Sequence, residues 1–308
     1  MPSFGDIQKE IQEERVPDTP YDIIRRKYLR KLSEKTERNT ILYYSGWLQK
    51  PIRSIAPLTS INDNDKNGFM SVVQGLDVSK GLDIILHTPG GDIAATESLI
   101  DYLNQKFEGD MRAIVPQLAM SGGTIIACAC REILMGKQSS LGPIDPQING
   151  MSASGIVSEF YHANKEIEQD SSKMNVWGPV IAGYPPALIE TCKKAISWSK
   201  ELAVEYLSGS MFEDELRSDH KSAKKKLDAI IRLLTDPNLT KSHARHIPTP
   251  TCKSYGLKIS EMEKDQDLQD IILSIHHASA LTIMNTPAVK IIENQNSKAY
   301  ISTYSKST

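Results

Sequence analysis

Short apolar runs alternate with amphipathic stretches along the first two thirds of the chain. The runs that suit strands lie at 41–44, 82–87, 111–116 and 132–136. The stretches between them place apolar residues at the spacing of a helix that is buried on one side. Strands that alternate with helices predict a parallel sheet with right-handed crossovers, so we expect an α/β domain over residues 40–186.

Helical patterns dominate both ends of the chain. Residues 1–39 predict two helical pieces interrupted near 16–20, and the second piece carries cationic residues at Arg25, Arg26, Lys27, Arg30 and Lys31. A basic amphipathic helix suits a membrane surface or nucleic acid. Acidic residues lie close on both sides, however, so we favour an arm packed on the domain or on a neighbouring subunit.

Beyond residue 186 the pattern is almost entirely helical. Long helices are expected at about 188–211, 221–234 and 261–284, and residues 288–303 predict a terminal hairpin around a polar turn. The sequence contains no internal repeat and no low-complexity linker. We therefore expect residues 187–308 to form a helical subdomain that folds onto the first part.

Two glycine-rich turns each follow an apolar run and open a helical stretch. They are Thr88-Pro89-Gly90-Gly91 and Met120-Ser121-Gly122-Gly123. Helix N-termini expose backbone N–H groups that attract negative charge, and ligands of parallel sheets lie beyond the carboxyl ends of the strands. The pair therefore predicts an oxyanion site, with the Ser121 hydroxyl presented as an acyl-transfer nucleophile. An ordinary turn in which Ser121 only caps a helix is the alternative that spacing alone leaves open.

Three motifs, in this order and spacing, resemble those of the Clp-fold serine peptidases. They are Leu86-His87-Thr88-Pro89-Gly90-Gly91-Asp92, Ala119-Met120-Ser121-Gly122-Gly123-Thr124 and Ser140-Leu141-Gly142-Pro143-Ile144-Asp145-Pro146-Gln147. The chain is most similar to the serine dehydrogenase proteinase family, and signal peptide peptidase A and the Clp peptidase subunit are more distant relatives. The resemblance implies a Clp/crotonase-like fold, Ser121 as the nucleophile, and the N–H groups of Gly91 and Gly122 as the oxyanion hole.

The general base is less clear from the sequence. The Clp pattern places a histidine in the segment that corresponds to residues 143–147, where this chain has Asp145 and Pro146. Signal peptide peptidase A uses a lysine further downstream. His162, Lys165 and Lys173 lie in that window, and we favour Lys173 because its loop could fold over the site and bury it, as a lysine base requires.

Composition and charge bear on the partners, the cellular compartment and the cofactors that we expect. The net charge of −2 favours neither nucleic acid nor an anionic membrane, and with no long apolar run and a charged first thirty residues we expect neither a spanning helix nor a secretory signal. The four cysteines lack metal-ligand spacing, which indicates reduced thiols in a cytoplasmic protein. His243 and His246 are weak evidence for a metal without a third ligand. The sequence contains no Gly-x-Gly-x-x-Gly turn, so nothing in it indicates a nicotinamide cofactor.

The sequence therefore predicts a serine endopeptidase without metal or cofactor that acts on peptide or protein substrates. The resemblance also implies a homo-oligomer that encloses its sites. Two alternatives stay open. A crotonase-like acyl-CoA enzyme would use the same paired amides without Ser121, and a non-catalytic scaffold would need no base.

Overall fold

The computed structural model describes residues 1–14, 20–51 and 53–305, so the interruption expected within 16–19 lies outside the described residues. A seven-stranded sheet forms the centre, in the order β10-β5-β3-β2-β1-β11-β12. The strands are β1 (Asn39–Ser45), β2 (Leu82–His87), β3 (Met111–Val115), β5 (Glu132–Met135), β10 (Ile259–Glu261), β11 (Ala288–Asn294) and β12 (Ala299–Thr303). The first five in the spatial order are parallel, and the pairs β1–β11 and β11–β12 are antiparallel. The predicted α/β fold with a mostly parallel sheet is confirmed.

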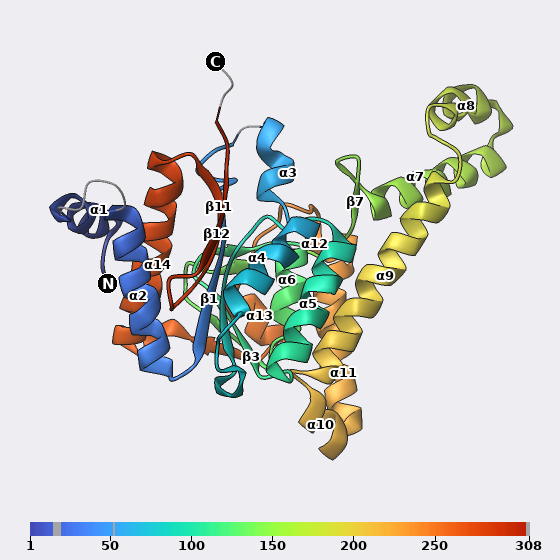
Figure 1. Ribbon diagram of the computed structural model, residues 1–308. Coiled ribbons are helices and arrows are strands. Elements are labelled where there is room, and N and C mark those ends of the chain that lie inside the picture. The colour runs from blue at the N-terminus through green and yellow to red at the C-terminus, as the bar shows by residue number, and fades with distance from the viewer. Residues whose placement is uncertain (15–19, 52, 306–308) are drawn as a thin grey trace.

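Helices cover both faces of this sheet (Figure 1). One face is covered by α4 (Asp63–Val73), α5 (Ile93–Phe107), α6 (Gly122–Cys128), α9 (Leu188–Gly209) and α11 (His220–Thr235). The other face is covered by α2 (Pro20–Thr36) and α14 (Gln266–Asn285), and α1 (Phe4–Glu13) packs outside these two helices. Side chains alternate along each strand: Tyr43 packs with the first group and Tyr44 with the second. Burial on both faces explains why the strands read as unbroken apolar runs.

The remaining elements lie between these layers, at their ends or, for two of the helices, outside the body of the molecule. They are α3 (Ala56–Thr59), α7 (Ala153–Gln169), α8 (Met174–Ala182), α10 (Glu213–Ser218), α12 (Pro237–Thr240) and α13 (Thr249–Tyr255), with β4 (Leu118–Ala119), β6 (Ser140–Leu141), β7 (Gln147–Ile148), β8 (Met151–Ser152) and β9 (Ile247–Pro248). Four single 3₁₀ turns occupy Arg53–Ile55, Val78–Lys80, Ser171–Lys173 and Met262–Lys264. Strands β4, β6 and β9 form a small second sheet.

The C-terminal part of the chain contributes strands to the central sheet. β11 pairs antiparallel with β1, and β10 extends the parallel edge beside β5. The sheet therefore continues across residue 186, because the segments that complete its edges come from far along the chain. The division at residues 39 and 186 stays a prediction about how the chain separates into units.

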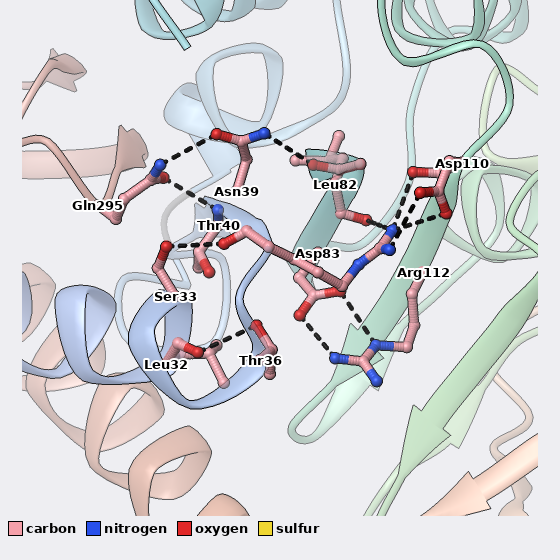
Figure 2. A network of polar contacts seen from close by, with 12 residues as sticks. Leu32, Ser33, Thr36, Asn39, Thr40, Leu82, Asp83, Asp110, Arg112 and Gln295 are labelled. Atoms are coloured by element: carbon pink, nitrogen blue, oxygen red, sulfur yellow. Dashed lines mark hydrogen bonds and ion pairs between the residues drawn. The ribbon is translucent and has the colours of Figure 1, made fainter. Parts of the chain in front are cut away.

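Charged side chains meet at the amino ends of the parallel strands (Figure 2). Asp83 is fully buried and accepts hydrogen bonds from Arg38 Nε at 2.9 Å and from Arg112 Nη2 at 2.6 Å. Arg38 also pairs with Asp110 at 3.0 Å. A buried carboxylate is tolerated only when it is paired in this way. The network thus holds three strand starts together at the edge opposite the glycine turns.

An arm formed by α7, α8 and the first half of α9 projects from the body (Figure 1). No residue of α8 is buried, and its exposed apolar side chains are Met174, Val176 and Val180. Within the described ranges, no helix combines the length and the apolar character that crossing a bilayer requires.

Candidate functional site

Ser121 lies in a strained turn between β4 and α6. Its φ of 51° and ψ of −117° are a backbone conformation that non-glycine residues rarely adopt. Such strain costs about 1–3 kcal/mol and persists only where the surroundings impose it, often at functional sites. The local conformation therefore favours a presented nucleophile over an ordinary cap, and the Ser121 side chain makes no capping hydrogen bond.

The two glycine turns lie side by side. Thr88 N donates to Leu118 O at 3.1 Å and Met120 N donates to Thr88 O at 3.0 Å, which continues the parallel pairing past the strand ends. Gly90 has φ +90°, and a Cβ built on it would lie 2.5 Å from the Ser121 Cβ. Only glycine fits this approach, so the turns converge as the sequence predicted.

The N–H groups of Gly91 and Gly122 are two unpaired donors in these turns. In the part of the chain that the structure describes, neither donates to a protein group, whereas the following amide, that of Gly123, donates to Met120 O at 2.8 Å. A Cβ built on Gly122 would lie 3.6 Å from Gly91 N, so the two residues are neighbours. Two adjacent unpaired amides can stabilise an oxyanion.

A cavity of about 350 Å³ opens over these groups. It is lined by Ser60, Pro89, Gly90, Gly91, Asp92, Ile93, Ser121, Gly122, Ile125, Ile144, Pro146, Gln147, Ile148, Ala195 and His243. Four isoleucines make much of its wall apolar. A concave apolar site with a few convergent polar groups is the usual form of a substrate pocket.

His243 is the histidine in this lining, and its partner is Asp145. His243 Nδ1 lies 2.9 Å from Asp145 Oδ1, and the histidine side chain is 28% exposed while the aspartate side chain is 8% exposed. With Nδ1–H donating to the carboxylate, Nε2 is left as a proton acceptor for the cavity. Ser152 Oγ donates to the other carboxylate oxygen, Oδ2, at 3.2 Å. Asp145 is thus placed to orient a histidine base.

The segment that carries Asp145 is itself anchored. Ile144 N donates to Leu234 O at 3.0 Å, and Ser199 Oγ donates to Ile144 O at 2.5 Å. His243 follows α12 in a turn, 98 residues beyond its aspartate partner. Sequence reasoning weighed His243 only as half of a metal pair. The one signal for its role was Asp145, a carboxylate at the motif position where the Clp pattern has a histidine.

The candidate bases taken from the sequence lie on the arm. His162 and Lys165 are in α7, Lys173 is in the 3₁₀ turn that follows it, and none of the three lines the cavity of this chain. All three are exposed, and His162 pairs with Glu166 at 3.2 Å. The loop that carries Lys173 does not fold over Ser121, and the burial that a lysine base needs is absent.

Two further residues of the first glycine motif, His87 and Asp92, have structural roles. His87 is buried, with Nδ1 3.0 Å from Ser45 O and Nε2 3.0 Å from Gln117 Oε1. Asp92 caps α5 by accepting from Ala95 N at 2.8 Å. The four cysteines are free and buried. Among the described residues, no group of three or more His, Cys, Asp or Glu side chains is placed to hold a metal.

Comparison with known proteins identifies a family and two relatives. The family model described as ClpP-like SDH-type serine proteinase matches residues 17–228. The chain is 30% identical over 136 residues to the uncharacterized protein MJ1495 of Methanocaldococcus jannaschii. The aligned region covers 44% of this chain and 41% of that relative. The chain is also 26% identical over 237 residues to the uncharacterized protein MJ0137 of the same organism. That aligned region covers 77% of this chain and 73% of that relative. The predicted family is confirmed: the chain belongs to the ClpP-like SDH-type serine proteinases.

Proposed function

We propose that this chain is a serine endopeptidase in which Ser121 attacks a peptide carbonyl and His243 serves as the general base. The observation that carries the proposal is one cavity that contains a strained serine, two unpaired amides and a histidine paired with a carboxylate. Membership of a serine proteinase family supports the same reaction class. The activity of the two relatives is not established, so the proposal rests mainly on this site.

The reaction would proceed through an acyl-enzyme. The Ser121 hydroxyl gives its proton to His243 Nε2 as Oγ bonds to the carbonyl carbon, and the N–H groups of Gly91 and Gly122 stabilise the oxyanion. The C–N bond then breaks, and the leaving amine takes the proton from His243. A water molecule activated by His243 hydrolyses the ester and restores the serine. Asp145 stays ionised and stabilises the imidazolium.

The strained conformation of Ser121 separates this proposal from its rivals. A crotonase-like acyl-CoA enzyme would use the Gly91 and Gly122 amides but would have no use for a presented hydroxyl or for the His243–Asp145 pair. A non-catalytic scaffold would need neither the paired amides nor the presented hydroxyl with its histidine–carboxylate pair. Peptidase chemistry gives the presented hydroxyl, the two amides and the histidine–carboxylate pair each a role, so we retain it as the single proposal.

We further propose that the protein acts in the cytoplasm as a homo-oligomer on peptide or protein substrates. Four free cysteines suit a reducing compartment. The exposed apolar side chains of α8 provide a surface that assembly would cover. The net charge of −2 does not favour nucleic acid as a partner.

Active-site labelling tests the peptidase proposal. A fluorophosphonate probe should modify the full-length protein at Ser121, identified by mass spectrometry of the labelled peptide, and should not modify Ser121→Ala. Labelling that persists in the alanine variant would remove Ser121 from the mechanism. Turnover of an acyl-CoA without any labelling would favour the crotonase alternative.

A further inference from the structure

A short segment beside the first glycine turn, residues 60–62, is the starting point. We name it the clamp segment. Ile61 forms an isolated parallel bridge with Gly91: Ile61 N donates to Gly90 O at 2.8 Å and Asp92 N donates to Ile61 O at 2.9 Å. A Cβ on Gly91 would collide with the Ile61 backbone, so the two chains are in the closest contact that glycine allows.

This bridge determines where the Gly91 amide points. Along an extended backbone, successive residues direct their polar groups to opposite sides. Gly90 O and Asp92 N both face Ile61, and the N–H of Gly91 therefore faces away from the clamp segment, toward the cavity. The Ile61 side chain also approaches Gly122: its Cδ1 would lie 3.1 Å from a Cβ built there. The clamp segment thus touches both residues that supply the proposed oxyanion donors.

A buried ion pair anchors the clamp segment from behind. Lys290 Nζ, on β11, lies 2.7 Å from Asp65 Oδ1 and donates to Ser60 O at 2.7 Å. Asp65, in the first turn of α4, accepts from Asn62 N at 3.0 Å. The Lys290 and Asp65 side chains are 1% and 3% exposed. Both ends of the clamp segment are therefore bound to the same ion pair.

Tyr43 completes the network. Its hydroxyl donates to Asp65 Oδ2 at 2.7 Å, from strand β1 in the middle of the sheet. Burying a lysine and a carboxylate together costs desolvation, and apolar residues of similar volume are often as stable. Stability alone does not account for a pair in this position, whereas fixing the geometry of a neighbouring segment does.

We propose that Asp65 and Lys290 are positioning residues for the oxyanion hole: through the clamp segment they hold Gly90–Asp92 so that the Gly91 N–H points into the cavity. The role rests on the proposed function, since it acts on the amide that would donate a hydrogen bond to the developing oxyanion. It predicts that the network affects transition-state stabilisation more than substrate binding.

The test compares one substitution at two buried carboxylates of the full-length protein. Asp65→Asn removes the charge behind the clamp segment, and Asp83→Asn removes the one at the opposite end of the sheet (Figure 2). With a fluorogenic peptide as substrate, Asp65→Asn should lower kcat about tenfold or more with little change in KM. This loss of kcat is smaller than the two to three orders of magnitude that follow removal of an oxyanion donor. Asp83→Asn should keep kcat within about twofold, because the two sites are independent.

Two measurements keep the outcome decisive. Tyr43→Phe leaves the ion pair in place and should lower kcat by a smaller factor than Asp65→Asn. Hydrogen exchange of the Ile61 and Asp92 amides, followed by mass spectrometry, should quicken in Asp65→Asn and not in Asp83→Asn. Urea unfolding curves give the folded fraction of each variant, so that rates are compared per folded molecule.

The possible failures are distinguishable. Equal losses of kcat in Asp65→Asn and Asp83→Asn, matched to their stabilities, would make the network merely structural and overturn the proposal. Unchanged exchange of Ile61 and Asp92 in Asp65→Asn would also overturn it, whether or not the protein hydrolyses peptides. Absence of Ser121 labelling in the wild type would instead refute the peptidase function, and with it any oxyanion hole for these residues to position.

Discussion

At the scale of single residues, the proposed chemistry depends on His243 and its orientation by Asp145. The pair joins a turn after α12 to the segment before β7, and the hydrogen bond to Nδ1 leaves the other ring nitrogen for proton transfer. Asp145 lies at the motif position that led us to expect a lysine base. In this arrangement the residue at that position is the hydrogen-bond partner of the candidate base and not the base itself.

His243→Asn should lower kcat by roughly two to four orders of magnitude, because an asparagine side chain cannot accept and return the proton. Lys173→Met is the matched control, since Lys173 is exposed on the arm and does not line the cavity. Peptide hydrolysis by purified full-length variants measures both. If Lys173→Met lost activity and His243→Asn kept it, the base would have to come from the arm, in this chain or from a neighbouring copy.

At the scale of elements, the turn between β2 and α5 is the part that tolerates least change. It must approach Ser121 closely and present the Gly91 amide at the same time. The clamp segment, β1 and β11 support it from one side, and the second glycine turn touches it from the other. A substitution here acts on the geometry of the whole site.

Gly90→Ala should abolish labelling of Ser121 and lower the free energy of unfolding by about 1–3 kcal/mol, because the new Cβ meets the Ser121 Cβ at a strained φ. Gly109→Ala is the control. Its φ of +72° is also positive, but no atom lies within 4 Å of the added Cβ. It should cost about 1 kcal/mol and keep labelling. Normal labelling of Gly90→Ala would mean that the turns are not as close as the structure places them.

At the scale of the whole molecule, a buried group of aromatic and histidine rings joins both strand and helix layers. His87 on β2 stacks on Tyr44 of β1 at 4.2 Å between ring centres and lies 5.4 Å from His276 of α14. Burial lowers the pKa of His87 to about 4, and it also lowers the pKa values of His276 and His277. These histidines are therefore neutral in the folded protein at neutral pH.

The protein should lose stability in mild acid. An unfolded histidine has a pKa of about 6.5, so between about pH 6.5 and 4 the unfolded state binds protons that the folded state excludes. Stability is complete above this window and falls as the pH drops through it, by up to about 3 kcal/mol for His87. Urea unfolding at several pH values measures the slope. His87→Gln should flatten it, and a slope unchanged from the wild type would assign the effect to other groups.

Short stretches of sequence determined the parts of this protein that depend on local conformation. Apolar runs specified four of the parallel strands, β1, β2, β3 and β5, and each glycine turn followed from the need of the backbone to bend sharply at a strand end. Ser121, Gly91 and Gly122 could be selected because each lies in a short motif that resembles those of the Clp-fold serine peptidases. The C-terminal hairpin was also visible, as two runs around a polar turn.

Only the tertiary structure decided which distant side chains meet. His243 reaches Asp145 across 98 residues of sequence, and Lys290 reaches Asp65 across 225. No periodicity or spacing encodes such contacts, because they depend on how sheet order brings separate segments together. For the same reason, the addition of β10, β11 and β12 to the sheet could not be read from the helical pattern around them. Short motifs therefore singled out the proposed nucleophile and the proposed oxyanion amides, while long-range packing selected the candidate base and the support behind the glycine turns.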